Sequence, residues 1–219
     1  RAMMPPADGI ASLVISGGPA IVLASASAVR TRLLSAAGVP HEIIPAHIDE
    51  AEVRDRLLAQ DTSHGVIAEV LAELKAQHVA TDMLAGRPDT IILGADQILS
   101  CEGDLFEKPA GLDGVREHLK RLSGKAHTLH AAVCAVRGGQ VIWHYSSAAK
   151  LRMRTLTDGF IERYVDCVGE AACESVGAYL LEGLGAHLFS EIDGDFFGIL
   201  GLPLLPVLEF LRNEDVVMT

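Results

Sequence analysis

The feature that most constrains the fold is a short apolar run, Thr90 to Leu93, which stops at Gly94-Ala95-Asp96. The run is nearly all aliphatic and β-branched, so it predicts a strand buried on both faces. Such strands belong to α/β sheets, whose ligands bind beyond the carboxyl ends of the strands. We therefore expect Asp96 to follow the strand directly and to stand at a ligand site. The residues alone leave open that Asp96 simply begins a turn.

A basic residue follows on a separate segment, because Lys108 lies directly before Pro109. The residue before a proline is biased against helical backbone, so Lys108 is expected on a turn or an extended segment. A carboxylate and an ammonium on adjoining loops suit a metal-bound phosphate.

A second strand is predicted over Ala20–Ala24, followed by a turn at Ser25-Ala26-Ser27 and a helix over Ala28–Ala37. The free N–H groups and the positive dipole end of that helix favour an anion, with Ser27 as the cap and Arg30 in the first turn. The alternative is an ordinary capped strand, turn and helix that binds no ligand.

The remaining pattern is that of an alternating α/β chain. A short strand is expected at His41–Pro45, and a long hairpin turns at Gly138-Gly139 between His127–Val136 and Gln140–Leu151. Further helices are predicted over His64–Met83, Gly111–Leu122, Gly159–Val168 and Leu204–Leu211.

Three finer expectations concern the buried face of one helix, one turn and one charged segment. The first of these further helices is expected to bury Val66, Ile67, Val70, Leu71 and Leu74. Residues 190–195 are expected to form a turn. The charged residues after Glu50 are expected to be solvated, namely Glu52, Arg54, Asp55 and Arg56.

Length and composition bound the class of protein. With 219 residues and a net charge of −11, the chain is long enough for a full core, and its charge argues against a nucleic-acid-binding surface. No apolar run has the length of a membrane span, and the amino end lacks signal-peptide features. We expect one domain over residues 20–212, with tails at 1–19 and 213–219 and the last seven residues frayed. The four cysteines show no zinc spacing and are expected to be free thiols.

The motifs resemble those of the Maf family of nucleoside triphosphate pyrophosphatases. Its central signature is matched by Gly94-Ala-Asp-Gln97, Lys108-Pro109 and Leu122-Ser-Gly124. The other matching blocks, in order, are Leu23-Ala-Ser-Ala-Ser27 with Arg30, then Ile48-Asp-Glu50, Leu71-Ala-Glu-Leu-Lys75-Ala76 and Gly201-Leu-Pro203. The chain departs from the opening motif, because Ala28 replaces a proline and Thr31 stands where some members carry a second arginine, with Arg32 next to it.

The resemblance implies an α/β fold with two lobes around a mixed sheet, related to inosine triphosphate pyrophosphatase, with the nucleotide between the lobes. It implies hydrolysis between the α and β phosphates, with Asp96, Glu50 and Lys108 as catalytic residues. Glu50 and Asp96 would hold Mg²⁺ or Mn²⁺. The remaining substrate-binding residues it implies are Ser25, Ser27, Arg30, Lys75, Gln97 and Glu182.

Base preference depends on two positions of the resemblance. Glu182 stands where the members that prefer dTTP and UTP carry Gln and where a 7-methyl-GTP subgroup carries Glu; Gln97 points the same way. A carboxylate accepts the donors of a guanine edge well, whereas a pyrimidine dione needs a donor and an acceptor, as an amide provides. We therefore favour 7-methyl-GTP, with dTTP or UTP as the alternative.

The resemblance also implies a cytoplasmic homodimer that takes a nucleoside triphosphate, without nucleic-acid or membrane partners. Two other functions stay open. One is a nucleotide-binding regulator of cell division with little turnover, and the other is a pyrophosphatase of the inosine triphosphate type.

Overall fold

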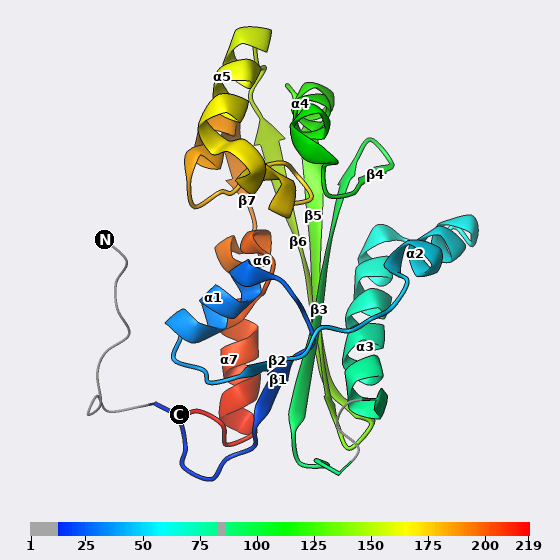
Figure 1. The fold of residues 1–219 in the computed structure, drawn as a ribbon, viewed down its shortest axis with the longest axis vertical. Helices are drawn as coiled ribbons and strands as arrows, with labels where there is room; N and C mark the ends of the chain where they lie inside the picture. Colours follow the sequence, from blue (N-terminus) through cyan, green and yellow to red (C-terminus); the bar gives the residue numbers. More distant parts are fainter. Residues whose placement is uncertain (1–12, 83–85) are drawn as a thin grey trace.

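A computed structural model describes residues 13–82 and 86–219 (Figure 1). Met83, where we placed the end of the helix that begins at His64, lies outside the described residues. The strands are β1 (Ile21–Leu23), β2 (Glu42–Ile43), β3 (Ile91–Cys101), β4 (Asp104–Phe106), β5 (Ala126–Arg137), β6 (Gln140–Met153) and β7 (Phe189–Asp193). The α-helices are α1 (Ala28–Ala36), α2 (Glu50–Ala59), α3 (His64–Asp82), α4 (Gly111–Leu122), α5 (Asp158–Val168), α6 (Phe196–Leu200) and α7 (Leu204–Asn213), and two 3₁₀-helices cover Gly169–Glu174 and Leu184–Leu188.

The strands form one mixed sheet in the order β2-β1-β3-β5-β6-β7, with β4 paired to β3. Strand β1 is parallel to β2 and β3, whereas β3, β5, β6 and β7 pair antiparallel. The predicted strand, turn and helix at β1 and α1 and the predicted hairpin between β5 and β6 are confirmed.

Two lobes share the long strands β3, β5 and β6, which run through both of them (Figure 1). In one lobe, side chains of α1 and α7 pack on one face of the sheet, and those of α3 pack on the opposite face. In the other lobe, α4 and α5 pack with the distal halves of the same strands. The expected two-lobed α/β fold is therefore confirmed.

Strand β3 is longer than predicted, and the placement of Asp96 after its end is wrong. Asp96 lies within β3, opposite Ala132 of β5, because β5 pairs with β3 without a break from Ile92 to Ser100. The parallel pairing with β1, however, does end at Leu93. Asp96 therefore still lies beyond the carboxyl end of the parallel part of the sheet, next to the turn that follows β1.

Gly94 serves the packing of α3 rather than a chain reversal. A Cβ atom at this position would lie 2.1 Å from the carbonyl oxygen of Ala72 and 2.8 Å from the amide nitrogen of Ala76. Only a glycine allows α3 to approach the sheet this closely. The same approach brings the next turn of α3, which carries Lys75, over the strand that carries Asp96.

Three other expectations are wrong in detail. Helix α3 buries Ile67, Ala68, Leu71, Ala72, Lys75, Ala76 and Val79, whereas Val66 is 43% exposed, because small residues let α3 lie closer on a rotated face. Residues 189–193 form the edge strand β7 rather than a turn. The last residues do not fray, since Val217 bridges Val14 and is buried with Val216 against the face that α1 and α7 cover.

The four cysteines are free, as expected, and Cys101 and Cys134 are buried, but Cys167 is exposed. Within residues 13–82 and 86–219, no helix combines the length and the apolar character needed to cross a bilayer.

Candidate active site

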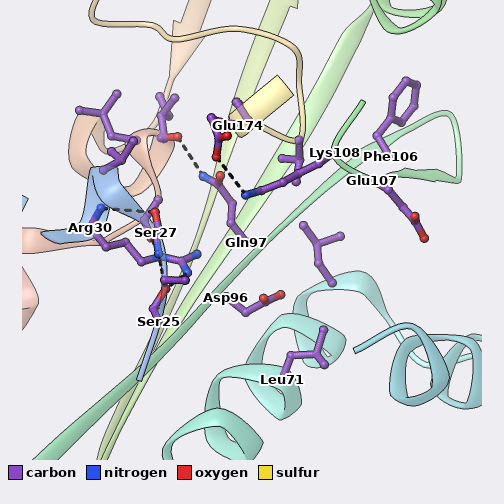
Figure 2. A pocket seen from close by; sticks show the side chains of 18 of the residues that line it. Ser25, Ser27, Arg30, Leu71, Asp96, Gln97, Phe106, Glu107, Lys108 and Glu174 are labelled. Atoms are coloured by element: carbon purple, nitrogen blue, oxygen red, sulfur yellow. Dashed lines mark hydrogen bonds and ion pairs between the residues drawn. The ribbon is translucent and has the colours of Figure 1, made fainter. Parts of the chain in front are cut away.

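A cavity of about 530 Å³ opens where the two lobes meet, and its walls come from both (Figure 2). The structure brings every predicted site residue to this cavity: Ser25, Ser27, Arg30, Glu50, Lys75, Asp96, Gln97, Lys108 and Glu182. These residues come from segments that are up to 157 positions apart in the sequence, from Ser25 to Glu182. Their convergence follows from the sheet order, which places the turn after β1 beside the middle of β3.

Lys75 is the centre of the buried charge cluster. Its ammonium nitrogen lies 2.7 Å from Oδ1 of Asp96 and 2.9 Å from Oε2 of Glu50. The side chains of Lys75 and Asp96 are each only 9% exposed, whereas that of Glu50 is 46% exposed. One cation therefore bridges two carboxylates, one at the bottom of the cavity and one nearer its opening.

Arg30 is also buried, close enough to Asp96 to lower its pKa, and it fixes the turn after β1. Its Nε atom donates to the carbonyl oxygen of Gly201 at 2.8 Å, and its Nη1 atom donates to Ser25 Oγ at 2.9 Å. Ser27 caps α1 by accepting from the amide of Arg30. Two of the five guanidinium donors are thus used for structure, and Arg30 keeps its charge when buried.

The protonation of Asp96 is set by opposing influences. Burial raises the pKa of Asp96 above its usual value, and the nearby charges of Lys75 and Arg30 lower it. Burial has the largest influence, so the net direction is upward. A carboxylate with a raised pKa is a better proton acceptor than an exposed one, which suits a general base.

Gln97, which we expected to bind substrate, contacts α6 through its side-chain amide. Its amide nitrogen donates to the carbonyl oxygens of Gly198 and Ile199, both at 2.9 Å. Both N–H groups are therefore engaged with α6. What Gln97 can offer a ligand in this arrangement is its side-chain oxygen.

The rim of the cavity carries ion pairs between exposed or partly exposed side chains. The ammonium of Lys108 lies 3.8 Å from Glu174 Oε2, and these side chains are 58% and 76% exposed (Figure 2). Glu182, the residue expected to set the base preference, pairs with Arg32 of α1. Arg32 is the arginine next to Thr31, where the opening motif departs from the family.

Sequence reasoning missed Arg54 and Glu107. Arg54 was assigned to a solvated surface, but it lines the cavity, its side chain is only 20% exposed, and it pairs with Glu107 of the loop after β4. The available signal was spacing, because Arg54 lies four residues after Glu50 and therefore on the same face of a helix. Glu107 offered only its position beside Lys108.

A buried polar pair supports the loop that carries Glu182. The hydroxyl of Tyr179, a residue that lines the cavity, lies 2.9 Å from Nε2 of His127 on β5. Burial lowers the pKa of His127 to about 4, so the imidazole is neutral at pH 7. Its Nδ1 atom has no hydrogen-bond partner among the described residues.

The two carboxylates that Lys75 bridges fit a hard divalent cation. Glu50 and Asp96 supply carboxylate oxygens, and the ammonium between them shows that this position favours positive charge. The described residues contain no cluster of three or more His, Cys, Asp or Glu side chains that could hold a metal ion. A cation here would therefore complete its shell with water or phosphate oxygens.

The sequence pattern of the Maf-like protein family matches residues 20–214, which include every residue of the cavity. The chain belongs to this family.

Curated relatives carry two kinds of name. The chain is 46% identical to a "Nucleoside triphosphate pyrophosphatase" of Paramagnetospirillum magneticum over 88% of this chain and 97% of the relative. It is 48% identical to a protein of the same name from Nitrobacter winogradskyi, over 90% and 95%. It is also 44% identical to a "7-methyl-GTP pyrophosphatase" of Rhizobium meliloti, over 91% and 98%.

Proposed function

We propose that the chain is a nucleoside triphosphate pyrophosphatase, which hydrolyses its substrate to a nucleoside monophosphate and pyrophosphate. The observation that carries this proposal is a buried carboxylate, Asp96, flanked by Arg30 and Lys75 at the bottom of a cavity of about 530 Å³. A polyphosphate chain needs such cations, and the attacking water needs such a base. The names of the relatives support the same activity.

In the proposed reaction, Asp96 orients a water molecule and accepts its proton as the oxygen bonds to the α-phosphorus. The bond from that phosphorus to the bridging oxygen breaks, and pyrophosphate leaves with the bonding electrons. Arg30, Lys75 and Lys108 neutralise the phosphate chain, while Ser25 and Ser27 add hydrogen bonds. No covalent nucleophile is required.

Glu50 and Asp96 would hold Mg²⁺ or Mn²⁺. Such a cation, when bound, polarises phosphate oxygens and lowers the pKa of a coordinated water. The ammonium of Lys75, which now neutralises both carboxylates, would then be available to the phosphates.

We propose 7-methyl-GTP as the preferred substrate, with dTTP or UTP as the alternative. Glu182 supports this choice, because it lines the cavity with a carboxylate, which attracts a base that carries a positive charge. The relatives do not decide between the substrates, since both names occur at similar identity. We also propose a cytoplasmic homodimer, and light scattering after size exclusion would test the dimer.

The test is pyrophosphate release with Mg²⁺ from 7-methyl-GTP, GTP, UTP, dTTP, CTP and ITP, by wild type and Glu182→Gln. We expect wild type to prefer 7-methyl-GTP and the variant to lose that preference. A wild-type preference for UTP or dTTP would sink the base assignment but keep the enzyme. A preference for ITP would favour the inosine triphosphate type, and no release from any substrate would favour a binding protein.

A further inference from the structure

Helix α2 directs one arginine into the cavity and another away from it. Arg54 lies one turn after Glu50, and both line the cavity. Arg56 is exposed and does not line it. The two arginines share a helix and a charge but differ in environment, so Arg56 is a natural control for Arg54.

Arg54 has carboxylate partners that are mostly exposed. Its Nη2 atom pairs with Glu107, whose side chain is 64% exposed, and its Nε atom lies 3.8 Å from Asp55, which is 74% exposed. Ion pairs with solvated carboxylates contribute little to stability, because each partner is nearly as well off in water. A stronger anion can therefore replace Glu107 at little cost.

The balance of charged residues in the cavity favours such a replacement. Its lining includes four basic residues, Arg30, Arg54, Lys75 and Lys108, and five acidic residues, Glu50, Asp96, Glu107, Glu174 and Glu182. A cation on Glu50 and Asp96 would offset those two carboxylates, and a polyphosphate would bind better still if the remaining acidic side chains withdrew from the basic ones. Glu107 and Glu174 are the exposed ones that hold Arg54 and Lys108.

We propose that Arg54 is a further ligand of the phosphate chain and that Glu107 holds its guanidinium until the phosphate arrives. The proposal rests on the proposed function, because it requires a polyphosphate in the cavity. A guanidinium can bind phosphate oxygens with two parallel hydrogen bonds, and in the free protein the Glu107 carboxylate occupies one side of it, at Nη2. Because Glu107 precedes Lys108, its release would also free the loop that presents Lys108.

The test compares three variants for binding of inorganic tripolyphosphate by calorimetry. We expect Arg54→Gln to weaken binding by about tenfold or more, since a charge-assisted hydrogen bond is lost. Arg56→Gln should bind like wild type. Glu107→Gln should bind about twofold to fivefold more tightly, because the competing carboxylate is gone.

The proposal predicts that Arg54→Gln and Glu107→Gln change the affinity for tripolyphosphate in opposite directions. A purely structural link between α2 and the loop would make both variants change in the same direction, because both break the same pair. A change in the same direction in both variants would overturn the proposal. Equal binding by Arg54→Gln and Arg56→Gln would also overturn it, and so would a wild type that does not bind tripolyphosphate. Should Arg54→Gln fail to fold, Arg54→Lys replaces it, and Glu107→Gln still has to bind more tightly.

Pyrophosphate release by wild type separates this inference from the proposed function. Release from a nucleotide together with unchanged binding by Arg54→Gln would sink only the role of Arg54. If the variants bind tripolyphosphate as expected but wild type releases no pyrophosphate from any nucleotide, Arg54 is supported as a phosphate ligand and the proposed pyrophosphatase activity is wrong.

Discussion

The bottom and the rim of the cavity hold charged side chains in different ways. At the bottom, Arg30, Lys75 and Asp96 are buried and project from α1, α3 and β3. At the rim, Glu107, Lys108, Glu174 and Glu182 lie outside the sheet on loops and short helical segments, and the first three are mostly exposed. Buried charges must remain paired, whereas exposed pairs can exchange partners at little cost. The comparison indicates a fixed centre beneath a rim whose ion pairs can exchange partners at little cost.

The largest expected effect is at the bottom, where Asp96→Asn should reduce turnover by about two to four orders of magnitude. The amide cannot accept the proton of the attacking water, although it keeps the size of the side chain. Steady-state pyrophosphate release measures the loss, and nucleotide binding by calorimetry should persist.

The matched control for Asp96→Asn is Glu174→Gln, which removes a carboxylate from the rim. It should keep turnover within about tenfold of wild type, because an exposed pair has little energy to lose. Turnover by Asp96→Asn close to that of wild type would contradict the role of Asp96 and favour a nucleotide-binding regulator.

The second prediction concerns the packing that brings Lys75 to Asp96. Gly94→Ala should destabilise the fold by about 3 kcal/mol or more, because the new methyl group would overlap the backbone of α3. Urea unfolding measures the change. Gly159→Ala is the control: it lies in α5 with no atom near the new methyl group, and it should be neutral or stabilising. Equal effects of the two substitutions would contradict the close approach of α3.

The third prediction concerns how the unfolding free energy depends on pH through His127, which is buried beneath the rim. The pKa of His127 is lowered by burial to about 4 in the folded state, so the unfolded chain binds more protons below pH 6.5 and stability falls as the pH falls toward 4. Between pH 7 and pH 5 this residue should cost wild type about 2 kcal/mol of unfolding free energy.

His127→Gln removes this titration, so the variant should lose about 2 kcal/mol less than wild type over the same pH interval. Urea unfolding of both proteins at pH 7 and pH 5 measures the difference. The same slope with pH in both proteins would mean that His127 is not buried as a neutral group.

The contrast between bottom and rim also explains what the sequence could predict. The bottom lies on regular elements whose periodicity and motifs are local, so Asp96, Lys75 and Arg30 could be assigned before the structure was known. The error over β3 arose because Gly94 marks a close helix contact and not a strand end. That distinction depends on Ala72 and Ala76 of α3, the helix before β3, and not on the residues around Gly94.

The ion pairs of the rim were harder to predict, because each joins two segments whose sequences give no indication that they contact each other. Nothing in the residues around Arg54 indicates Glu107 as its partner, and nothing around Arg32 indicates Glu182. Charged residues on a helix are solvated in most proteins, so the general rule outweighed the four-residue spacing from Glu50. Arg30, Lys75 and Lys108 were expected at the site from the sequence, whereas only the folded arrangement of the two lobes places Arg54 there.

The smallest expected effect on stability is at Arg32, which pairs with Glu182 and is 58% exposed. Arg32→Gln should change the unfolding free energy by less than about 1 kcal/mol. It should still raise the ratio of 7-methyl-GTP to GTP turnover, because the freed carboxylate attracts a positively charged base more strongly. Arg163 is exposed on α5, so Arg163→Gln is the control that removes one positive charge elsewhere on the surface. An unchanged ratio would mean that Glu182 does not contact the base. In that case only the ion pairs that face the phosphates would exchange partners when the substrate binds.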